Sequence, residues 1–376
     1  MIGIHKNHPS AYFDGVRGLA VMFVWLSHSS GRDQELVSWL SFHGLGHIGV
    51  MLFFVLSGYL LAIPFENGRD FSYSRYLLRR FLRIIPLYYI VVTGVYIFQL
   101  YYGTTNTDYL YIEQGFWGYL KHLVLYRGDG IFWTIPTEFV FYLILPLVAL
   151  FLLSQRVLRF VLVGVLALLY GIYHLAINIK IVSAPGLALI ETGHHSQYLD
   201  VFLIGVMFGL LSKNEYIINN YRNHFKLLDR AIFFVFVAVI ILTIIAVCKS
   251  IFVFNQPFYN VRYASFLYAF LFALTLFSLQ IGNKYLKLIF ESRLLIYMGV
   301  IGYSWYLLHM PAIQMVNTLE LSSWIKFILS STLLFAVCTI TYILIEEPFI
   351  KIGKYLSIKK VQGNCLVSCD KQPGKY

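Results

Sequence analysis

Two ionisable residues interrupt the first apolar stretch of the sequence, FDGVRGLAVMFVWLSHSS. Arg17 and His28 are eleven residues apart, close to three helical turns, so they share one face of a helix and lie roughly 16 Å apart along its axis. Histidine is a natural general base. The alternative is a snorkelling arginine and a histidine that only packs between helices. Because ionisable residues are costly in a membrane, we interpret this pair as functional.

A second charged cluster lies in RYLLRRFLRIIP, just before another apolar stretch. Arg75, Arg79 and Arg83 follow an i, i+4, i+8 spacing, which puts them on one helical face, and Arg80 lies beside them. Four guanidinium groups at the entrance of a span suit a ligand with several phosphates. The alternative is an anchor that contacts anionic lipid.

The third candidate lies in WTIPTEFVFYLILP. Pro136 is typical of the first position of a helix, and Glu138 then falls in the first turn, where the helix dipole favours a carboxylate. Glu138 is either a simple helix cap or a residue that orients His28 or an acceptor hydroxyl.

Several other polar residues receive structural interpretations. His309 is expected to be structural, before a kink at Pro311. Glu346 and Glu347 are expected at the cytoplasmic surface, paired with basic neighbours. Histidines and cysteines show no metal-site spacing, so no metal is expected.

The composition requires lipid around most of these residues. The chain has 376 residues, of which 59% are hydrophobic and only 12% are charged, whereas soluble domains have about 25% charged residues. This excludes soluble and disordered classes and predicts an all-α, polytopic membrane bundle. Ten stretches are long enough to span a bilayer: 13–30, 45–64, 84–102, 137–153, 157–179, 198–212, 231–252, 262–281, 294–316 and 324–346. In the second stretch, Ser57 and Gly58 permit close helix packing.

The distribution of positive charge supports this count. With both termini in the cytoplasm, 21 Lys and Arg residues fall in inner segments and 7 in outer ones, as the positive-inside rule requires. The net charge of +11 therefore marks membrane orientation, and no nucleic-acid partner is expected. The expected domains are a membrane domain, 1–356, and a short polar cytoplasmic tail, 357–376.

The longest outer connection, about 103–133, is rich in aromatic residues, among them Trp117 and Trp133. Such residues are typical of a membrane–water interface. The alternative is a stacking platform for an acceptor such as a sugar.

The sequence resembles the acyltransferase type 3 family of integral membrane O-acyltransferases, which modify bacterial glycans. Five blocks match in order: FDGVRGLAV with His28, GVMLFFVLSGYLLA, RYLLRRFLRIIPLYY, FWTIPTEFVFYLILPL, and GYSWYLLHMP followed by IEEPF. The resemblance implies that Arg17 and His28 are essential for transfer. It also implies that Arg75, Arg79, Arg80 and Arg83 bind acyl-CoA. The family's tryptophan–hydroxyl–x–x–x–glutamate pattern matches Trp133, Thr134 and Glu138, with Thr in the more usual Ser position. Trp133 and Thr134, with Trp117, are expected to bind the acceptor.

The resemblance implies transfer of an acyl group, most simply acetyl, from cytosolic acyl-CoA to a carbohydrate or glycolipid hydroxyl. His28 is then a general base or a transient acyl carrier, and no permanently bound cofactor is expected. The expected location is the bacterial cytoplasmic membrane. Some relatives have an extracytoplasmic domain, whose role is expected to fall to the core, an oligomer or a partner. A transporter or flippase, and a non-catalytic sensor, are the alternative classes.

Overall fold

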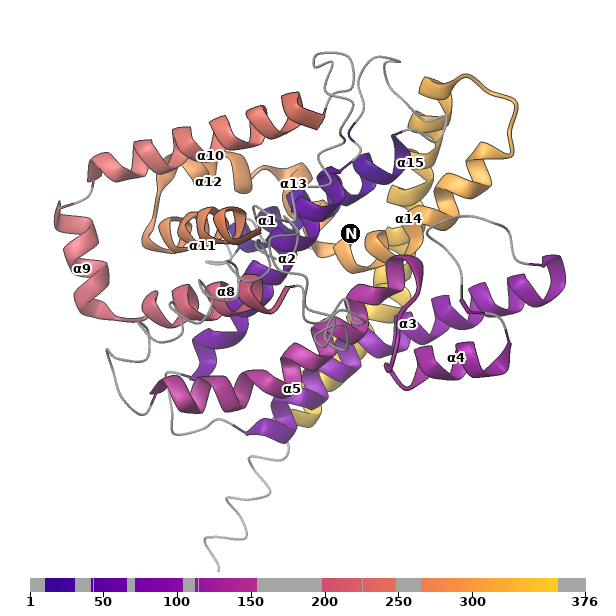
Figure 1. The fold of residues 1–376 in the computed structure, drawn as a ribbon, viewed down its shortest axis with the longest axis horizontal. Coiled ribbons are helices and arrows are strands. Elements are labelled where there is room, and N and C mark those ends of the chain that lie inside the picture. Colours follow the sequence, from indigo (N-terminus) through magenta and orange to yellow (C-terminus); the bar gives the residue numbers. More distant parts are fainter. Residues whose placement is uncertain are drawn as a thin grey trace, which may run out of the picture.

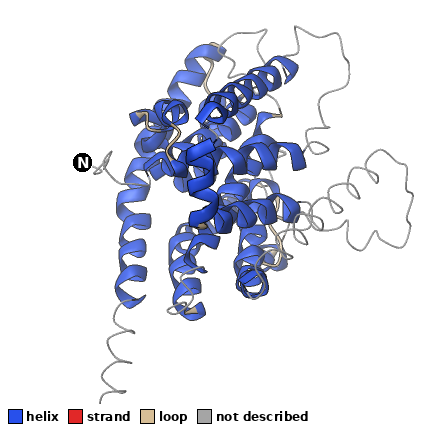
Figure 2. Ribbon diagram, turned by 90° about the vertical axis from the view of Figure 1, so that its left-hand side faces the viewer, coloured by secondary structure: helices blue, strands red, loops and turns tan. Residues whose placement is uncertain are grey.

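The computed structural model of the protein describes residues 11–30, 42, 44–65, 72–103, 112–113, 115–153, 198–224, 226–247 and 265–357. Every regular element in these ranges is helical, as Figure 2 shows. The all-α class is therefore confirmed for this part of the chain. The predicted span 157–179 and nearly all of the predicted tail lie outside the described residues.

The helices follow the apolar stretches of the sequence. In chain order they are α1 (Ala11–Ser29), α2 (Leu45–Ala62), α3 (Tyr73–Tyr102), α4 (Phe116–Leu123), α5 (Thr134–Leu153), α8 (Leu199–Leu211), α9 (Glu215–His224), α10 (Lys226–Val247), α11 (Ser265–Ile281), α12 (Lys284–Phe290), α13 (Arg293–Val300), α14 (Gly302–Asn317) and α15 (Ser323–Thr341). A π-helical turn, Tyr342–Glu346, continues α15.

Four described helical segments are long and apolar enough to cross a membrane: Leu45–Ala62, Tyr73–Tyr102, Leu228–Ile245 and Ser323–Ser357. Two bent helix pairs raise this number to six if each pair is one span. The chain is thus a protein with several membrane helices, while ten spans and cytoplasmic termini stay predictions.

Helices α1 and α2 lie at the centre of the fold (Figure 1). Helix α1 packs against α2, α13 and α14, and α2 packs against α8 and α11. Helices α3, α4 and α5 lie on one side of this central pair, and α8 to α11 lie on the other. Arg17 and His28 therefore lie on a helix that other helices surround.

Glycines explain how α1 packs so closely. A Cβ atom at Gly15 or Gly18 would collide with the backbone carbonyl of Phe290 or Leu295, and one at Gly299 would collide with Asp14. Small residues allow membrane helices to approach in this way. The packing predicted at Gly58 is confirmed in the same terms, because a Cβ atom there would collide with a backbone carbonyl of α8.

The predicted span 294–316 differs from expectation. It consists of two helices, α13 and α14, which meet at Ile301. Helix α14 continues through Pro311, so the interruption precedes the proline by almost three turns. This break places the start of α14 beside Arg17, whose Cγ atom would lie 3.6 Å from a Cβ atom at Gly302.

Candidate active site

One face of α1 connects two cavities. Arg17 lines the first cavity, and both Val21 and Val24 line the second. His28 lies on the same face, one turn beyond Val24. The shared face predicted for Arg17 and His28 is thus the face that α1 turns toward the interior cavities.

The first cavity has about 640 Å³ of empty volume and three arginines in its wall: Arg17, Arg80 and Arg83. Arg17 also forms the predicted ion pair with Asp14. The guanidinium group of Arg80 lies 5.8 Å from the ring centroid of Tyr142, a cation–π distance. This arginine cavity places fixed positive charge around a space between the helices.

The structure divides the predicted arginine cluster. Arg80 and Arg83 line the arginine cavity, but Arg75 and Arg79 do not. Arg79 is exposed, and its Cα atom faces Gly353 on the helix that follows α15. Of the i, i+4, i+8 series on α3, Arg83 lines the cavity. Packing between α3 and the C-terminal helix turns Arg79 outward.

The second cavity has about 450 Å³ of empty volume and an almost entirely apolar wall. Phe53, Glu138 and Tyr303 line both cavities, so the two adjoin at these residues. Thr134 and Tyr306 lie in the wall of the second, apolar cavity. A ligand bound to the arginines could extend past Glu138 into an apolar space.

Glu138 is a buried carboxylate at this junction. Its Oε1 atom accepts hydrogen bonds from the hydroxyl of Ser57, at 3.1 Å, and from that of Tyr142. Ser57 was expected only to allow close packing, so its hydrogen bond to Glu138 is an additional finding. The structure thus joins Glu138 to Ser57 of α2 and to Tyr142, one turn further along α5. The aromatic ring that lies beside His28 belongs to a different helix, α14.

That ring is His309 of α14. Nδ1 of His28 lies 2.9 Å from Nε2 of His309, and the two rings stack with centroids 5.0 Å apart. Nδ1 of His309 lies 2.6 Å from the carbonyl oxygen of Tyr306. His309 is fully buried. The sequence assigned His309 a structural role, and its contact with the candidate base was not predicted.

Tyr306 connects this histidine pair to α5. Its hydroxyl donates to the carbonyl of Ile131 at 2.8 Å and accepts from Thr134 Oγ1 at 3.0 Å. Trp133, the neighbour of Thr134, stacks on Tyr198 with centroids 5.3 Å apart. Tyr306 therefore links Thr134, which follows Trp133, to the histidine pair.

Glu346 differs from its predicted position. It is buried, and its Oε1 atom accepts hydrogen bonds from the backbone N–H of Ser304, at 3.0 Å, and from the Ser304 hydroxyl. A carboxylate at the start of α14 is favoured by the helix dipole. Glu347 does pair with a basic neighbour, Lys351, at 2.9 Å.

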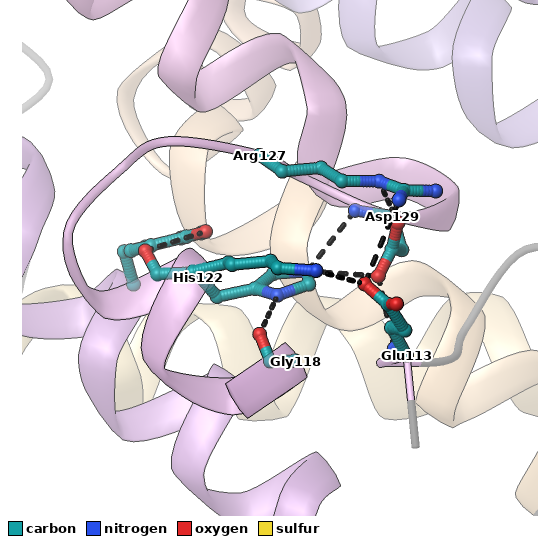
Figure 3. Close-up of polar contacts among 7 residues, drawn as sticks. Glu113, Gly118, His122, Arg127 and Asp129 are labelled. Carbon is teal, nitrogen blue, oxygen red and sulfur yellow. Dashed lines mark hydrogen bonds and ion pairs between the residues drawn. The ribbon is translucent and has the colours of Figure 1, made fainter. Parts of the chain in front are cut away.

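The connection between α3 and α5, which the sequence predicts to be an outer segment, contains a separate polar cluster, shown in Figure 3. Asp129 accepts hydrogen bonds from the backbone N–H of Glu113 at 2.9 Å and from Arg127 Nε at 2.8 Å. Its own N–H donates to Nε2 of His122 at 3.0 Å, and Nδ1 of that ring lies 3.0 Å from the carbonyl of Gly118. We call this set, with Lys121, the outer-loop cluster.

Two pKa values in this cluster are lowered for different reasons: that of Glu113 by neighbouring positive charge and that of His122 by burial. A hydrogen bond and ion pair from Lys121 lower the pKa of Glu113, with a further contribution from Arg127. Burial lowers the pKa of His122, so this ring is neutral near pH 7.

Trp117 lies on the exposed side of α4, outside the cluster, with 73% of its surface exposed. Among the residues that the structure describes, no group of three or more His, Cys, Asp or Glu could hold a metal ion.

Comparison with known proteins agrees with the sequence blocks. The family model described as "Acyltransferase domain" matches residues 10–346. Peptidoglycan O-acetyltransferase OatA of Listeria monocytogenes is 31% identical over 161 residues, which are 38% of this chain and 24% of that protein. A Staphylococcus aureus (strain COL) protein, named provisionally as an O-acetyltransferase, is 24% identical across 90% of this chain and 57% of its own length.

A protein of Acidianus two-tailed virus, named provisionally as an acetyltransferase, is 34% identical over 112 residues, 29% of this chain and 32% of its own. The chain thus spans from about a quarter to less than three fifths of the length of these relatives. No solved structure matches.

Proposed function

The chain belongs to the acyltransferase family whose model matches residues 10–346, and from this premise we propose that it is a membrane O-acetyltransferase. It transfers an acetyl group from cytosolic acetyl-CoA to a hydroxyl of a carbohydrate at the bacterial cytoplasmic membrane. The names of OatA and of the staphylococcal relative support this reaction.

One observation carries the proposal: the arginine cavity and the apolar cavity adjoin along the face of α1 that bears Arg17 and His28. A CoA thioester has phosphates at one end and a narrow, largely uncharged arm at the other. Arginine binds phosphate through several directed hydrogen bonds, and the apolar cavity receives the arm.

In this proposal Arg17, Arg80 and Arg83 hold the phosphates of the donor. Arg75 and Arg79, earlier on α3, attract the polyanion toward the cavity, because charge steers association even without direct contact. Arg17 and His28 are separated by roughly 16 Å of helix rise, which a pantetheine arm can bridge.

The reaction step balances as a simple transfer. His28 takes the proton of the acceptor hydroxyl, the hydroxyl oxygen forms a bond to the thioester carbonyl carbon, and the carbon–sulfur bond breaks. The proton then passes to the departing CoA thiolate. In the second route His28 itself receives the acetyl group and then passes it to the acceptor, with the same net products.

Glu138 and the aromatic residues act on the acceptor. Glu138 lies at the junction of the cavities and orients the acceptor hydroxyl. Trp133, stacked on Tyr198, and Thr134 bind the sugar near the apolar cavity, while Trp117 receives the glycan at the outer surface. Flat aromatic rings suit the apolar face of a sugar. OatA is named for peptidoglycan, which makes a glycan the acceptor to test first.

The test uses the full chain in lipid nanodiscs, with radiolabelled acetyl-CoA and soluble peptidoglycan fragments or other surface oligosaccharides. We expect label in the glycan fraction. Arg83→Gln should raise the KM for acetyl-CoA about tenfold, the loss of one charge-assisted hydrogen bond, whereas Arg79→Gln, outside the cavity, should change it less than about twofold. Equal effects of the two variants would contradict the assigned donor site.

The same preparation separates the alternatives. Movement of a glycan or small molecule across liposomes without acetyl-CoA would support a transporter or flippase. Binding of acetyl-CoA without transfer to any acceptor, in cells or in nanodiscs, would support a sensor. Comparing the mass of surface glycans between cells with and without the protein identifies the acceptor.

A further inference from the structure

The geometry of the histidine pair, His28 and His309, indicates which nitrogen of His28 is basic. Residues 281 positions apart in the chain bring two imidazole rings within hydrogen-bond distance. The second ring is fully buried and comes from a different helix, α14. A stacked ring that serves only packing does not need its nitrogens aligned with those of its neighbour.

The hydrogen bonds define which nitrogen bears each proton. A carbonyl oxygen can only accept, so the 2.6 Å contact between Tyr306 O and Nδ1 of His309 requires a proton on that nitrogen. In a neutral ring Nε2 of His309 is then the acceptor. The 2.9 Å contact between the rings therefore requires the proton on Nδ1 of His28.

We infer that His309 is a positioning residue that fixes the tautomer of His28, so that Nδ1 bears the proton and Nε2 is the basic nitrogen. This inference rests on the proposed function, since it assigns the nitrogen of His28 that takes the hydroxyl proton or the acetyl group. The other tautomer of His309 would place the lone pair of its Nδ1 against a lone pair of the Tyr306 carbonyl oxygen.

His309 also stabilises the charged form of His28. When Nε2 takes a proton, the Nδ1–H group of the imidazolium becomes a stronger donor, and Nε2 of His309 accepts it. Hydrogen bonds to charged groups are stronger than those between neutral groups. The anchor of this arrangement is Tyr306, which lines the apolar cavity and accepts a hydrogen bond from Thr134. The ring of His28 is therefore oriented relative to the space in which we place the thioester.

Two substitutions at one position test the inference in the full chain in nanodiscs. His309→Leu removes the acceptor, and we expect kcat for acetyl transfer to fall about 10- to 100-fold, the range for one hydrogen bond to a charged group, with little change in the KM for acetyl-CoA. His309→Gln keeps an acceptor oxygen at the end of the side chain, and we expect it to recover most of this loss. His122→Leu and His122→Gln are the matched controls for removing a buried histidine.

A spectroscopic measurement makes the test independent of turnover. In protein labelled with ¹⁵N-histidine, the His28 signals are those lost in His28→Ala. We expect the Nδ1–H tautomer in the unaltered protein and in His309→Gln, and a mixture of tautomers in His309→Leu. Thermal unfolding of each variant shows whether it remains folded.

The outcomes separate the inference from the function. A His28 ring with its proton on Nε2 in the unaltered protein would overturn the inference, as would equal kcat values for the Leu and Gln variants. Failure of the unaltered protein to transfer acetyl groups would overturn the proposed function, while the tautomer measurement would still judge the geometry.

Discussion

Two histidines of this protein, the buried His122 and the half-buried His28, occupy opposite kinds of environment. His122 has both ring nitrogens bonded to backbone groups only four and seven residues away, in the outer-loop cluster. His28 is instead bonded through Nδ1 to a ring on a distant helix. A histidine held by its own loop stabilises that loop. For a histidine held by a second histidine, on a helix face whose neighbouring residues line cavities, we propose a role in proton transfer.

The largest expected difference between the two sites is in catalysis. His28→Ala should reduce acetyl transfer about 10²- to 10⁴-fold, the usual contribution of a general acid–base residue. His122→Leu should leave kcat of the folded protein within about threefold, because this neutral ring holds a loop outside the cavities. The measurement is single-turnover transfer in nanodiscs, normalised to folded protein. Similar losses in the two variants would remove the distinction between the sites.

The next largest effect concerns the packing that positions His28. Gly18→Ala places a methyl group against the carbonyl of Leu295, so we expect a loss of about 3 kcal/mol, the upper end for overpacking, with loss of transfer. Gly94→Ala, where nothing lies within 4 Å, is the control and should be neutral or slightly stabilising. Thermal unfolding and transfer are measured together. Normal unfolding of Gly18→Ala would show that α1 can move without cost.

The two sites also differ in how well the sequence predicted them. Arg17 and His28 lie on one helix, so the helical repeat alone placed them on one face. The contact between His28 and His309 depends on how α1 packs against α14, and no local pattern encodes it. The burial of Glu346 has the same cause, because its partner, Ser304, is 42 residues away.

The arginines show where a periodicity argument ends. The spacing of Arg75, Arg79 and Arg83 correctly indicates one face of α3, but only tertiary packing decides which face meets the cavity. Arg80, outside that series, lines the cavity with Arg83, whereas Arg79 is exposed. The helical fold of the described residues was predictable from composition and apolar length. The break at Ile301 was not, because Val300, Ile301 and Gly302 continue the apolar stretch without a proline.

A third prediction concerns stability rather than rate. His122→Leu leaves the buried N–H of Asp129 without its acceptor, which costs about 1–3 kcal/mol for an unpaired buried group. We expect a lower thermal unfolding midpoint, measured with purified protein in detergent. Tyr126→Leu, in the same loop but 73% exposed, is the control and should change the midpoint little. An unchanged midpoint in His122→Leu would show that the outer-loop cluster does not stabilise the fold.

The smallest effect is a dependence of stability on pH. Burial lowers the pKa of His122 below its usual value of 6.5, so between these two values the unfolded chain binds a proton that the folded protein does not. The contribution to stability is therefore fully present above about pH 6.5 and is lost as the pH falls toward the lowered folded pKa. Asp129 and Glu113 oppose this lowering and Arg127 adds to it.

The measurement is the thermal unfolding midpoint from pH 7.5 to 5, for the unaltered protein and for His122→Leu. The other histidines and the carboxylates titrate in both proteins, so the difference between the two curves isolates His122. As the pH falls below 6.5, we expect the unfolding midpoint of the unaltered protein to decrease more than that of the variant. Parallel curves would mean that His122 binds its proton equally well in the folded and unfolded states. In that case the ring would be able to exchange protons after all, and the contrast between the outer-loop cluster and the histidine pair would rest on position alone.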